Sequence, residues 1–278
     1  MVIYPLYQKA KKLLNSEYQK NFEIVKKSNF HRAFVDEKIK HSLQVSGAGN
    51  GILANEAYFK GKSREFIDIV KTAILLHDIY RFREARGWYE TGQKIDHSVK
   101  GSEFLSGRAD FDNVLITLPI KHHGHMIEQM YEDESYLALD DKTKDEVKHI
   151  AWAVRDADKI ANWYLFQKDW HNIQDIWLSF PHDFSLKQAK IDDILWHYFI
   201  QETVAPKDLV KTNADNVMSV ICWLFDMNYK YSIFYSQKLN LFAGWKNLLE
   251  QCHVNPAQID TVCKIMKEFV LKKFEIKI

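Results

Sequence analysis

The sequence predicts an all-α fold, and three observations support this prediction. Apolar residues recur at helical spacing along much of the chain, no stretch sustains the two-residue alternation of a strand, and there are only five prolines in 278 residues. This length is enough for a core domain and a smaller second one. We expect an N-terminal helical segment over residues 1–30, a helical core over 31–165 and a C-terminal helical region over 166–278, packed on the core.

Five helices can be placed from their periodicity and their ends. They are a helix that begins near Asp36 and the segments 63–80, 141–166, 185–203 and 256–274. Ser63 is a suitable N-cap, and Pro256 stands near the start of the last helix, where its missing N–H costs little. Ser185 and Gln188 have the spacing of a capping box, which marks the start of the fourth helix.

Loops are expected over residues 81–96, 106–112 and 124–140. Gly47, Gly49 and Gly51 fall inside the first predicted helix, and each weakens it by roughly 1 kcal/mol relative to Ala. Close packing against a neighbouring helix would explain them, and so would a break after Ser46. They do not form a nucleotide-binding loop, because no strand precedes them and Ile52 stands where GxGxxG requires its last glycine.

The charge balance argues against nucleic acid or a membrane as the main partner, because Lys and Arg number 38 and Asp and Glu 37. No apolar run approaches the roughly 18 residues that a membrane span needs. The N-terminus lacks the apolar region and cleavage site of a signal peptide. Cys222, Cys252 and Cys263 form no CxxC pair and are expected to be reduced thiols. We therefore expect a cytoplasmic protein.

Three polar side chains stand on helix faces that are otherwise apolar. The stripes are Phe66, Val70, Ala73 and His77; Val147, Ala151, Val154 and Asp158; and His41, Val45, Ala48 and Ile52. A buried imidazole or carboxylate is costly unless it is paired or coordinated. A single histidine on such a face would usually be a core residue bonded to a carbonyl, but three such helices favour a shared metal ion. Neutral imidazole and carboxylate are good ligands for Mn, Fe, Zn, Ni or Co.

Two further aspartates can be placed relative to these faces. Asp78 follows His77 directly and lies about 100° round the predicted helix. Asp156 is two residues from Asp158 and points about 200° away from it. We therefore assign Asp158 to the metal and expect Asp156 to support a ligand or to cap a helix.

A second group of histidines lies further along the chain. His97 follows the predicted loop, and His122, His123 and His125 fall in the word KHHGH. The KHHGH cluster could be a solvated helix end. Alternatively, His97 and either His122 or His123 meet the cleft that holds the first group.

The order of His41, then His77 with Asp78, then Asp158 resembles the H…HD…D signature of the HD-domain superfamily. The surrounding words fit as well: IKHSLQVS, AILLHDIYRF, DHSVKGSEFL, IKHHGH and VRDADKIANW. The resemblance covers residues 31–165, close to half of the chain. It implies an HD-type helical bundle, a divalent metal and hydrolysis of phosphomonoesters, phosphodiesters or nucleotides.

The metal ligands that the resemblance carries over are His41, His77, Asp78 and Asp158. In the subfamilies with two metals, Asp78 would bridge the ions, and His97 with His122 or His123 would hold the second. Mn, Fe, Co, Ni, Zn and Mg all stay open, with one or two ions per chain. Many relatives have Gly where this chain has Tyr80, and the HD-GYP signature is absent, which argues against a cyclic dinucleotide phosphodiesterase.

The expected reaction is attack of a metal-activated water on a phosphate ester, of a nucleotide or a related small molecule. The expected catalytic residues are Asp78 and, where they are not ligands, His97 or His125 as a proton donor to the leaving oxygen. Arg81 and Lys94 are candidates for phosphate contacts, with a solvated charged loop as the alternative. Solvated charges are the expectation for the other nearby cations, Arg83, Arg86, Lys121, Arg155 and Lys159.

The C-terminal region is rich in aromatic residues and resembles no family. Its tryptophans include Trp170, Trp177, Trp196, Trp223 and Trp245, and we expect them to pack in the core or between subunits rather than to stack on a ligand. This region could cover the site or form a homodimer. The expected partner is a small phosphate ester.

Two other functions compete with the hydrolase. Some relatives with the same core use a mixed-valence di-iron pair and O₂ to cleave a C–C or C–P bond, and their ligand order H…HD…H…H…D is satisfied here too. Iron content and O₂ consumption would distinguish that oxygenase. The other alternative is a non-catalytic module with a structural metal, which would bind metal yet hydrolyse no phosphoester.

Overall fold

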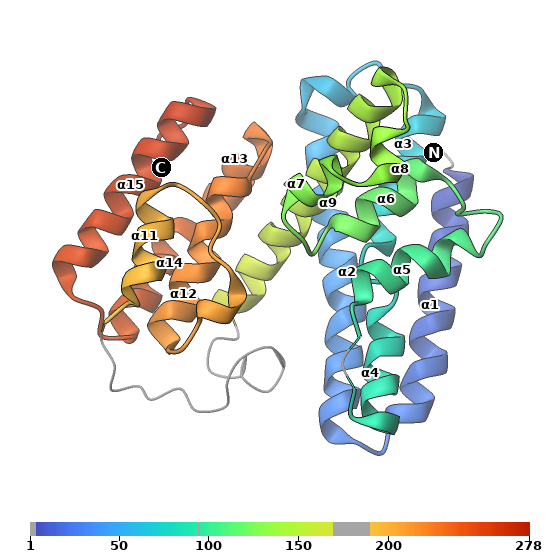
Figure 1. The fold of residues 1–278 in the computed structure, drawn as a ribbon, viewed down its shortest axis with the longest axis horizontal. Helices are drawn as coiled ribbons and strands as arrows, with labels where there is room; N and C mark the ends of the chain where they lie inside the picture. Colours follow the sequence, from blue (N-terminus) through green and yellow to red (C-terminus); the bar gives the residue numbers. More distant parts are fainter. Residues whose placement is uncertain (1–3, 94, 169–189) are drawn as a thin grey trace. The chain divides into compact units, whose positions relative to one another are not determined.

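The computed structural model describes residues 4–93, 95–168 and 190–278, which form helices joined by turns and no strand (Figure 1). The predicted all-α fold is confirmed. The first elements are α1 (Pro5–Val25), α2 (Asn29–Asn55), η1 (Ala57–Phe59), α3 (Arg64–Leu76), α4 (Arg81–Thr91), α5 (His97–Ser106), α6 (Val114–His122), α7 (Ile127–Tyr131), α8 (Glu134–Leu137) and α9 (Asp141–Lys168). The later ones are α11 (Asp193–Ile200), η2 (Lys207–Leu209), α12 (Asn213–Ile221), η3 (Cys222–Asp226), α13 (Lys230–Lys238), α14 (Leu241–Gln251) and α15 (Pro256–Phe274).

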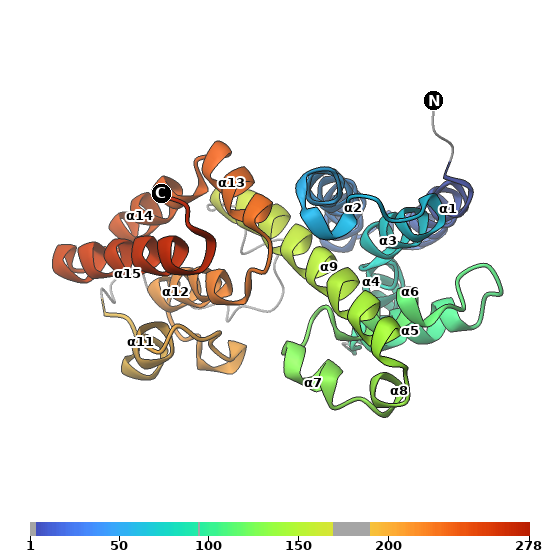
Figure 2. The same cartoon turned by 90° about the horizontal axis from the view of Figure 1, so that it is seen from above.

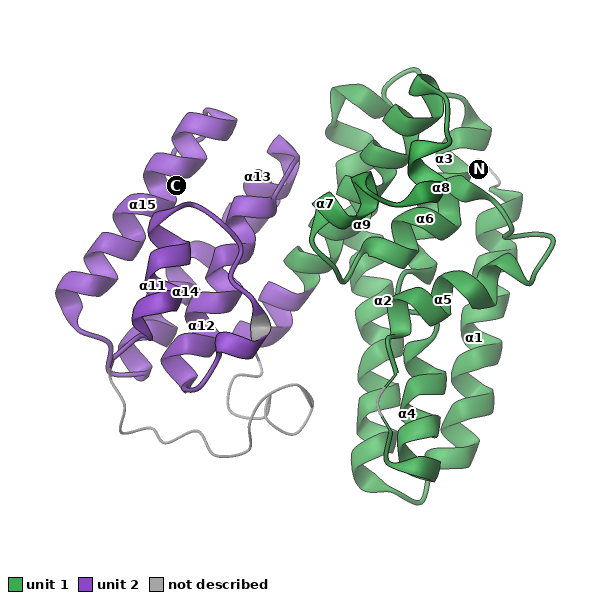
Figure 3. Ribbon diagram, viewed as in Figure 1, with its two compact units in different colours: residues 1–161 green, residues 162–278 purple. Residues whose placement is uncertain are grey.

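The contacts divide the chain into two compact units, residues 1–161 and 162–278 (Figure 3). The division falls inside α9, so that Asp158 belongs to the first unit. The boundaries that the sequence suggests, at residues 30 and 165, stay predictions.

Helices α1 to α4 form the main bundle of the first unit. α1 contacts α2, α3 and α4, and α2 contacts α3 and α4 (Figures 1 and 2). Asp68 of α3 accepts from the backbone N–H groups of Leu6 and Tyr7, at 2.9 and 2.8 Å, and so supplies partners that the first turn of α1 lacks. α6 packs on both α5 and α3, and Leu118 of α6 shares a buried apolar cluster with Val147 of α9.

The glycines of α2 do not break it. The helix runs unbroken through Ser46 as far as Asn55, so the proposed break after Ser46 is wrong. Gly49 explains why a small residue is needed: a Cβ built there would lie 2.8 Å from two side-chain carbons of Ile74 in α3. Close helix packing is therefore the correct interpretation at Gly49, where α2 approaches Ile74 of α3.

The helix predicted over 63–80 ends at Leu76, four residues early. Ser63 caps its start by accepting from the N–H of Phe66 at 3.1 Å, as expected. A tight turn then follows, in which the N–H of Ile79 bonds the carbonyl of Leu76 at 3.0 Å. Neither Gly nor Pro marks this turn. Ile79 and Phe82 are fully buried beyond it, so packing redirects the chain without a local sequence signal.

The other predicted helices differ mainly at their ends. α9 and α15 match the predicted 141–166 and 256–274 closely, whereas α2 begins at Asn29 rather than near Asp36. In the described part of 185–203 the helix is α11, capped by Asp192, while Ser185 and Gln188 lie outside the described residues.

Two of the predicted loops contain helices. Residues 81–96 hold α4, which ends at Gly92 in the left-handed region with φ 71°. Residues 124–140 hold the short helices α7 and α8, whereas 106–112 contain no helix beyond Ser106. Hydrophobic periodicity does not predict α4, because the apolar face of this helix is narrow. Phe82 and Ala85 are its buried apolar residues.

The second unit is organised around α12, which is buried along its whole length. α12 contacts α11, η3 and α14, and α14 contacts α13 and α15. Trp163 and Trp245 are fully buried with ring centroids 5.6 Å apart, and the indole N–H of Trp163 donates to the carbonyl of Val220 at 3.0 Å. Core packing is thus shown for Trp245, whereas Trp170 and Trp177 lie outside the described residues. In the parts of the chain that the structure describes, no helix combines the length and apolar character of a membrane span.

Candidate metal centre

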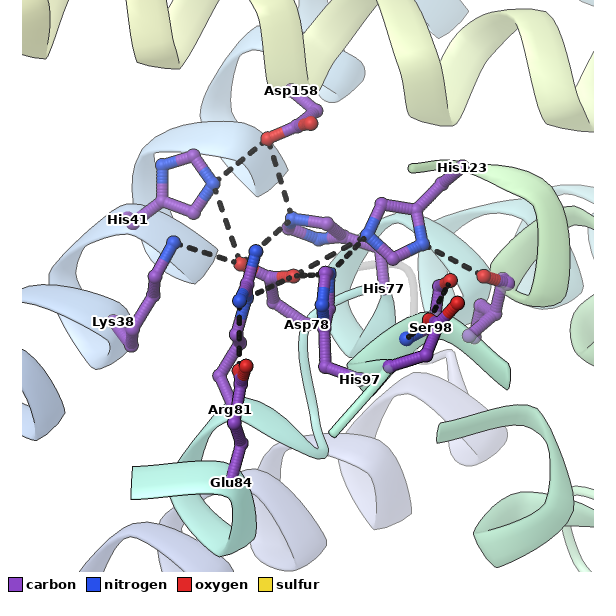
Figure 4. A network of polar contacts seen from close by, with 12 residues as sticks. Lys38, His41, His77, Asp78, Arg81, Glu84, His97, Ser98, His123 and Asp158 are labelled. Atoms are coloured by element: carbon purple, nitrogen blue, oxygen red, sulfur yellow. Dashed lines mark hydrogen bonds and ion pairs between the residues drawn. The ribbon is translucent and has the colours of Figure 1, made fainter. Parts of the chain in front are cut away.

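Six imidazole and carboxylate side chains converge inside the first unit (Figure 4). They are His41 from α2, His77 and Asp78 from the turn after α3, His97 at the start of α5, His123 just after α6, and Asp158 from α9. We call His41, His77 and Asp158 the first side of the centre, and His97 and His123 its second side. Asp78 lies between the two sides.

The first side forms around one oxygen of Asp158. Its Oδ1 lies 2.8 Å from Nε2 of His41 and 3.5 Å from Nε2 of His77. Both imidazoles are fully buried. These three side chains are the ones that the apolar stripes had selected, and they meet although His41 and Asp158 are 117 residues apart in sequence.

The turn after α3 determines how His77 is oriented. Its Nδ1 lies 2.9 Å from the carbonyl oxygen of Ile74, three residues earlier, a group that is available because the helix ends there. Nδ1–H therefore donates to this carbonyl, and Nε2 carries the lone pair. Nε2 makes no hydrogen bond among the described residues and faces Oδ2 of Asp78 at 3.7 Å.

His123 is oriented in the same way at the end of α6. Its Nδ1 lies 2.7 Å from the carbonyl oxygen of Ile120, again three residues earlier. Its Nε2 is 3.3 Å from Oδ1 of Asp78 and 3.3 Å from Nε2 of His97. His97 itself lies 3.2 Å from the same Asp78 oxygen.

The two oxygens of Asp78 face different sides of the centre. Oδ2 is 3.8 Å from Nε2 of His41 and 3.7 Å from that of His77. Oδ1 faces His97 and His123. A carboxylate in this position is suited to be shared between two cations, one on each side.

These residues fit a divalent cation. Ligand atoms of His41, His77 and Asp158 lie within 4.8 Å of one another, and so do those of His77, Asp78 and His123. The lone pairs of His77 and His123 face carboxylate oxygens, an arrangement that is repulsive unless a positive charge stands between them. Imidazole nitrogen and carboxylate oxygen together favour Mn, Fe, Co, Ni or Zn.

The electrostatics of the centre keep both carboxylates ionised. Burial alone would raise the pKa of Asp78, but Lys38, His77 and Arg81 outweigh it and hold that pKa well below its usual range. Burial opposes ionisation of Asp158 too, yet the adjacent imidazoles of His41 and His77 lower its pKa well below normal.

The histidines respond to the same surroundings in opposite directions. Burial, assisted by Arg81, lowers the pKa of His97 well below normal, so this imidazole is neutral and can act as a ligand. The pKa of His77 is raised, because Asp78 and Asp158 outweigh its burial. His77 thus has a strong affinity for positive charge, whether a proton or a metal ion.

Lys38 is a charged neighbour that the sequence reasoning missed. Its Nζ lies 3.2 Å from Oδ2 of Asp78, and only 17% of its side chain is exposed. It stands three residues before His41, so the two share a face of α2. This shared face alone does not distinguish a lysine beside a carboxylate from a solvated one.

His122 and His125 do not join the centre. Nε2 of His122 lies 2.8 Å from Asp133, and Nε2 of His125 lies 2.9 Å from Asp96. His123 rather than His122 thus takes the position predicted for either residue. The predicted roles of His122 as a ligand and His125 as a proton donor find no support in this geometry.

The structure describes only one of the two predicted phosphate contacts, Arg81 and Lys94. Arg81 borders the centre, with Nε 3.5 Å from Oδ1 of Asp78 and Nη1 2.7 Å from Glu84. Lys94 lies outside the described residues. The expectation of a solvated charge is wrong for Arg155 and Lys159, which are both buried.

Arg155 holds the turn that carries His123. Its Nη1 donates to the carbonyls of His122 and His123, at 2.9 and 3.1 Å, and also to that of His125. These carbonyls lie at and beyond the end of α6, where a helix has no partners of its own for them. Arg155 is one turn before Asp158 on α9, and so it ties the second side of the centre to the helix of the first.

Comparison with protein families gives a match for this part of the chain. Residues 39–163 match the family model of the HD domain, and all six converging side chains lie within the match. Residues 39–163 therefore form an HD domain, and proteins with this domain are in general metal-dependent phosphohydrolases. Searches of curated proteins and of solved structures found no match.

Proposed function

We propose that this protein is a metal-dependent phosphohydrolase that acts on a phosphate ester of a nucleotide or related small molecule. The observation that supports it is the convergence of four imidazoles on two carboxylates, the half-buried Asp158 and the buried Asp78, with Asp78 placed between two sides of the centre. His41, His77, Asp78 and Asp158 would hold one ion. Asp78, His97 and His123 would hold a second.

The chain prepares these ligands before any ion binds. The carbonyls of Ile74 and Ile120 fix the protons of His77 and His123 on Nδ1, so that both Nε2 atoms carry the lone pair that a metal ion requires. A divalent ion, when bound, supplies Lewis-acid polarisation of a phosphoryl oxygen and a hydrolytic water of near-neutral pKa. Arg81, anchored by Glu84 beside Asp78, would contact the phosphate.

The test is metal analysis combined with an activity panel. The purified protein should contain one or two divalent ions per chain and should release phosphate from p-nitrophenyl phosphate, its bis ester or a nucleotide in a metal-dependent way. Asp78→Ala should lose both metal and turnover, whereas the surface variant Asp110→Ala, whose side chain is 52% exposed, should keep both.

Three results would contradict the proposal. Asp78→Ala with full metal content and activity would remove Asp78 from the centre. Two irons per chain with O₂ consumption and no phosphate release would make the protein an oxygenase. Bound metal without turnover of any phosphoester would favour a non-catalytic module.

A further inference from the structure

Lys38 occupies the position beside Asp78 at which a cation is needed. Its ammonium pairs with Oδ2 of Asp78 at 3.2 Å, and that oxygen also faces His41 and His77. An ion held by the first side of the centre requires the same oxygen. Lys38 and a divalent ion therefore compete for one carboxylate, and two positive charges at such short range repel each other.

Metal binding would consequently release Lys38 from Asp78. The side chain has a flexible four-carbon stem and can move its charge by several ångströms, which a planar guanidinium cannot do as easily. It is rooted on α2 one turn before His41, so its ammonium stays next to the centre. A released ammonium that is largely buried needs a new anionic partner there.

Arg81 is unsuited to this exchange. Its Nη1 is bound to Glu84 at 2.7 Å, so its charge keeps a protein partner when Asp78 is taken by an ion. Among the described residues, the ion pair of Lys38 is with Asp78. The two cations flanking Asp78 thus differ: one is anchored and the other is exchangeable.

We propose that Lys38 is an anion-binding residue of the metal-loaded centre, whose ammonium leaves Asp78 when metal binds and pairs with an oxyanion of the substrate. The proposal rests on the proposed phosphohydrolase function and deepens it, because it specifies a substrate with an anionic oxygen next to the metal ligands. In the metal-free protein, the same ammonium neutralises Asp78.

Two binding experiments test this, with Lys38→Met and the control Lys40→Met. Lys40 lies on the same helix with 67% of its side chain exposed. The first experiment titrates the metal-free proteins with Mn²⁺ by calorimetry. Lys38→Met should bind Mn²⁺ at least about tenfold more tightly than wild type, because a competing cation is gone. Lys40→Met should match wild type.

The second experiment measures binding of inorganic phosphate to the Mn²⁺-loaded proteins. Lys38→Met should bind phosphate at least about tenfold more weakly, and Lys38→Arg, which restores a cation, should recover part of the affinity. Unchanged phosphate affinity in Lys38→Met, or unchanged or weaker Mn²⁺ affinity, would overturn the proposal. If Lys38→Met does not fold, Lys38→Gln is measured against Lys38→Arg by the same criteria.

The two proposals can fail separately. If the wild-type protein hydrolyses no ester but phosphate binding still depends on Lys38, the hydrolase proposal is wrong and the anion-site proposal stands. If the wild-type protein hydrolyses phosphoesters but its phosphate affinity does not change when Lys38 is substituted, only the anion-site proposal is wrong.

Discussion

The two sides of the metal centre are built differently. His41, His77 and Asp158 come from α2, the turn after α3, and α9, which are distant in sequence, whereas His97 begins α5 and His123 directly follows α6, and these two consecutive helices pack on each other. His41 sits within α2, and its Nδ1 makes no hydrogen bond among the described residues, while His77 and His123 follow helix ends and bond carbonyls there. Histidines at helix ends are thus oriented by the backbone, whereas His41 depends on its carboxylate partner.

The largest expected effect is the difference between substitutions at the adjacent residues His122 and His123. His123→Gln should lower metal-dependent turnover at least about tenfold and remove one ion per chain, because the second side loses a ligand. His122→Gln is the matched control and should retain metal and activity, since His122 pairs with Asp133. Metal analysis and steady-state kinetics check both. A larger loss of metal and turnover in His122→Gln than in His123→Gln would show that His122, and not His123, is the ligand.

Arg155 should matter to the second side through the turn that it holds. Arg155→Met leaves buried carbonyls after α6 without their donor, and we expect a loss of about 3 kcal/mol in the free energy of unfolding. Arg155→Lys should recover part of this loss. Urea unfolding of the metal-free proteins measures this loss. An unfolding midpoint in Arg155→Met equal to that of wild type would show that the turn after α6 is stable without Arg155.

The first side depends instead on how closely α2 approaches α3. Gly49→Ala would push a methyl group to 2.8 Å from Ile74, so it should destabilise the protein by about 1–3 kcal/mol. Gly47→Ala, on the exposed face of the same helix with nothing within 4 Å, should stabilise it by up to about 1 kcal/mol. Thermal unfolding of the two variants measures whether each substitution lowers or raises the Tm. Equal shifts in Tm for Gly49→Ala and Gly47→Ala would contradict the packing argument.

The smallest expected effect concerns Asp96, which caps the helix that begins at His97. Burial raises the pKa of Asp96, but hydrogen bonds from Ser98 and His125 outweigh it and lower that pKa below its ordinary value of 3.8. A lowered pKa means that the ionised carboxylate stabilises the folded state above pH 4, and that this contribution is lost as pH falls further. Asp96→Asn should cost up to about 1 kcal/mol at pH 7.

The difference between Asp96→Asn and wild type should shrink as the pH falls from 5 to 3. Urea unfolding at several pH values measures it. A difference that stays constant over this range would show that the charge of Asp96 contributes nothing beyond its hydrogen bonds.

The sequence was most informative where long helices carry the ligands. His41 and Asp158 could be found because unbroken periodicity defines the inner faces of α2 and α9. The argument for His77 assumed that the helix continues to residue 80, yet it ends at Leu76. His77 and Asp78 still reach the centre, because the turn directs both inward.

Other features were beyond sequence spacing. Which of two adjacent histidines turns inward after α6 depends on where that helix ends, and a shift of one residue would exchange them. Lys38 was missed because a lysine is normally solvated, and only the structure shows its ammonium beside a buried carboxylate. α4 was missed because burial by the other helices, rather than local periodicity, stabilises it.

The use of backbone carbonyls to place the protons of His77 and His123 has an evolutionary consequence. A carbonyl belongs to every residue type, so no substitution at Ile74 or Ile120 can delete the acceptor. Variation at these two positions can alter packing while the imidazole tautomers are inherited unchanged. Proton placement in this centre is therefore robust to mutation, and drift in activity should arise at residues such as Lys38 and Arg81, whose side chains themselves carry the charge.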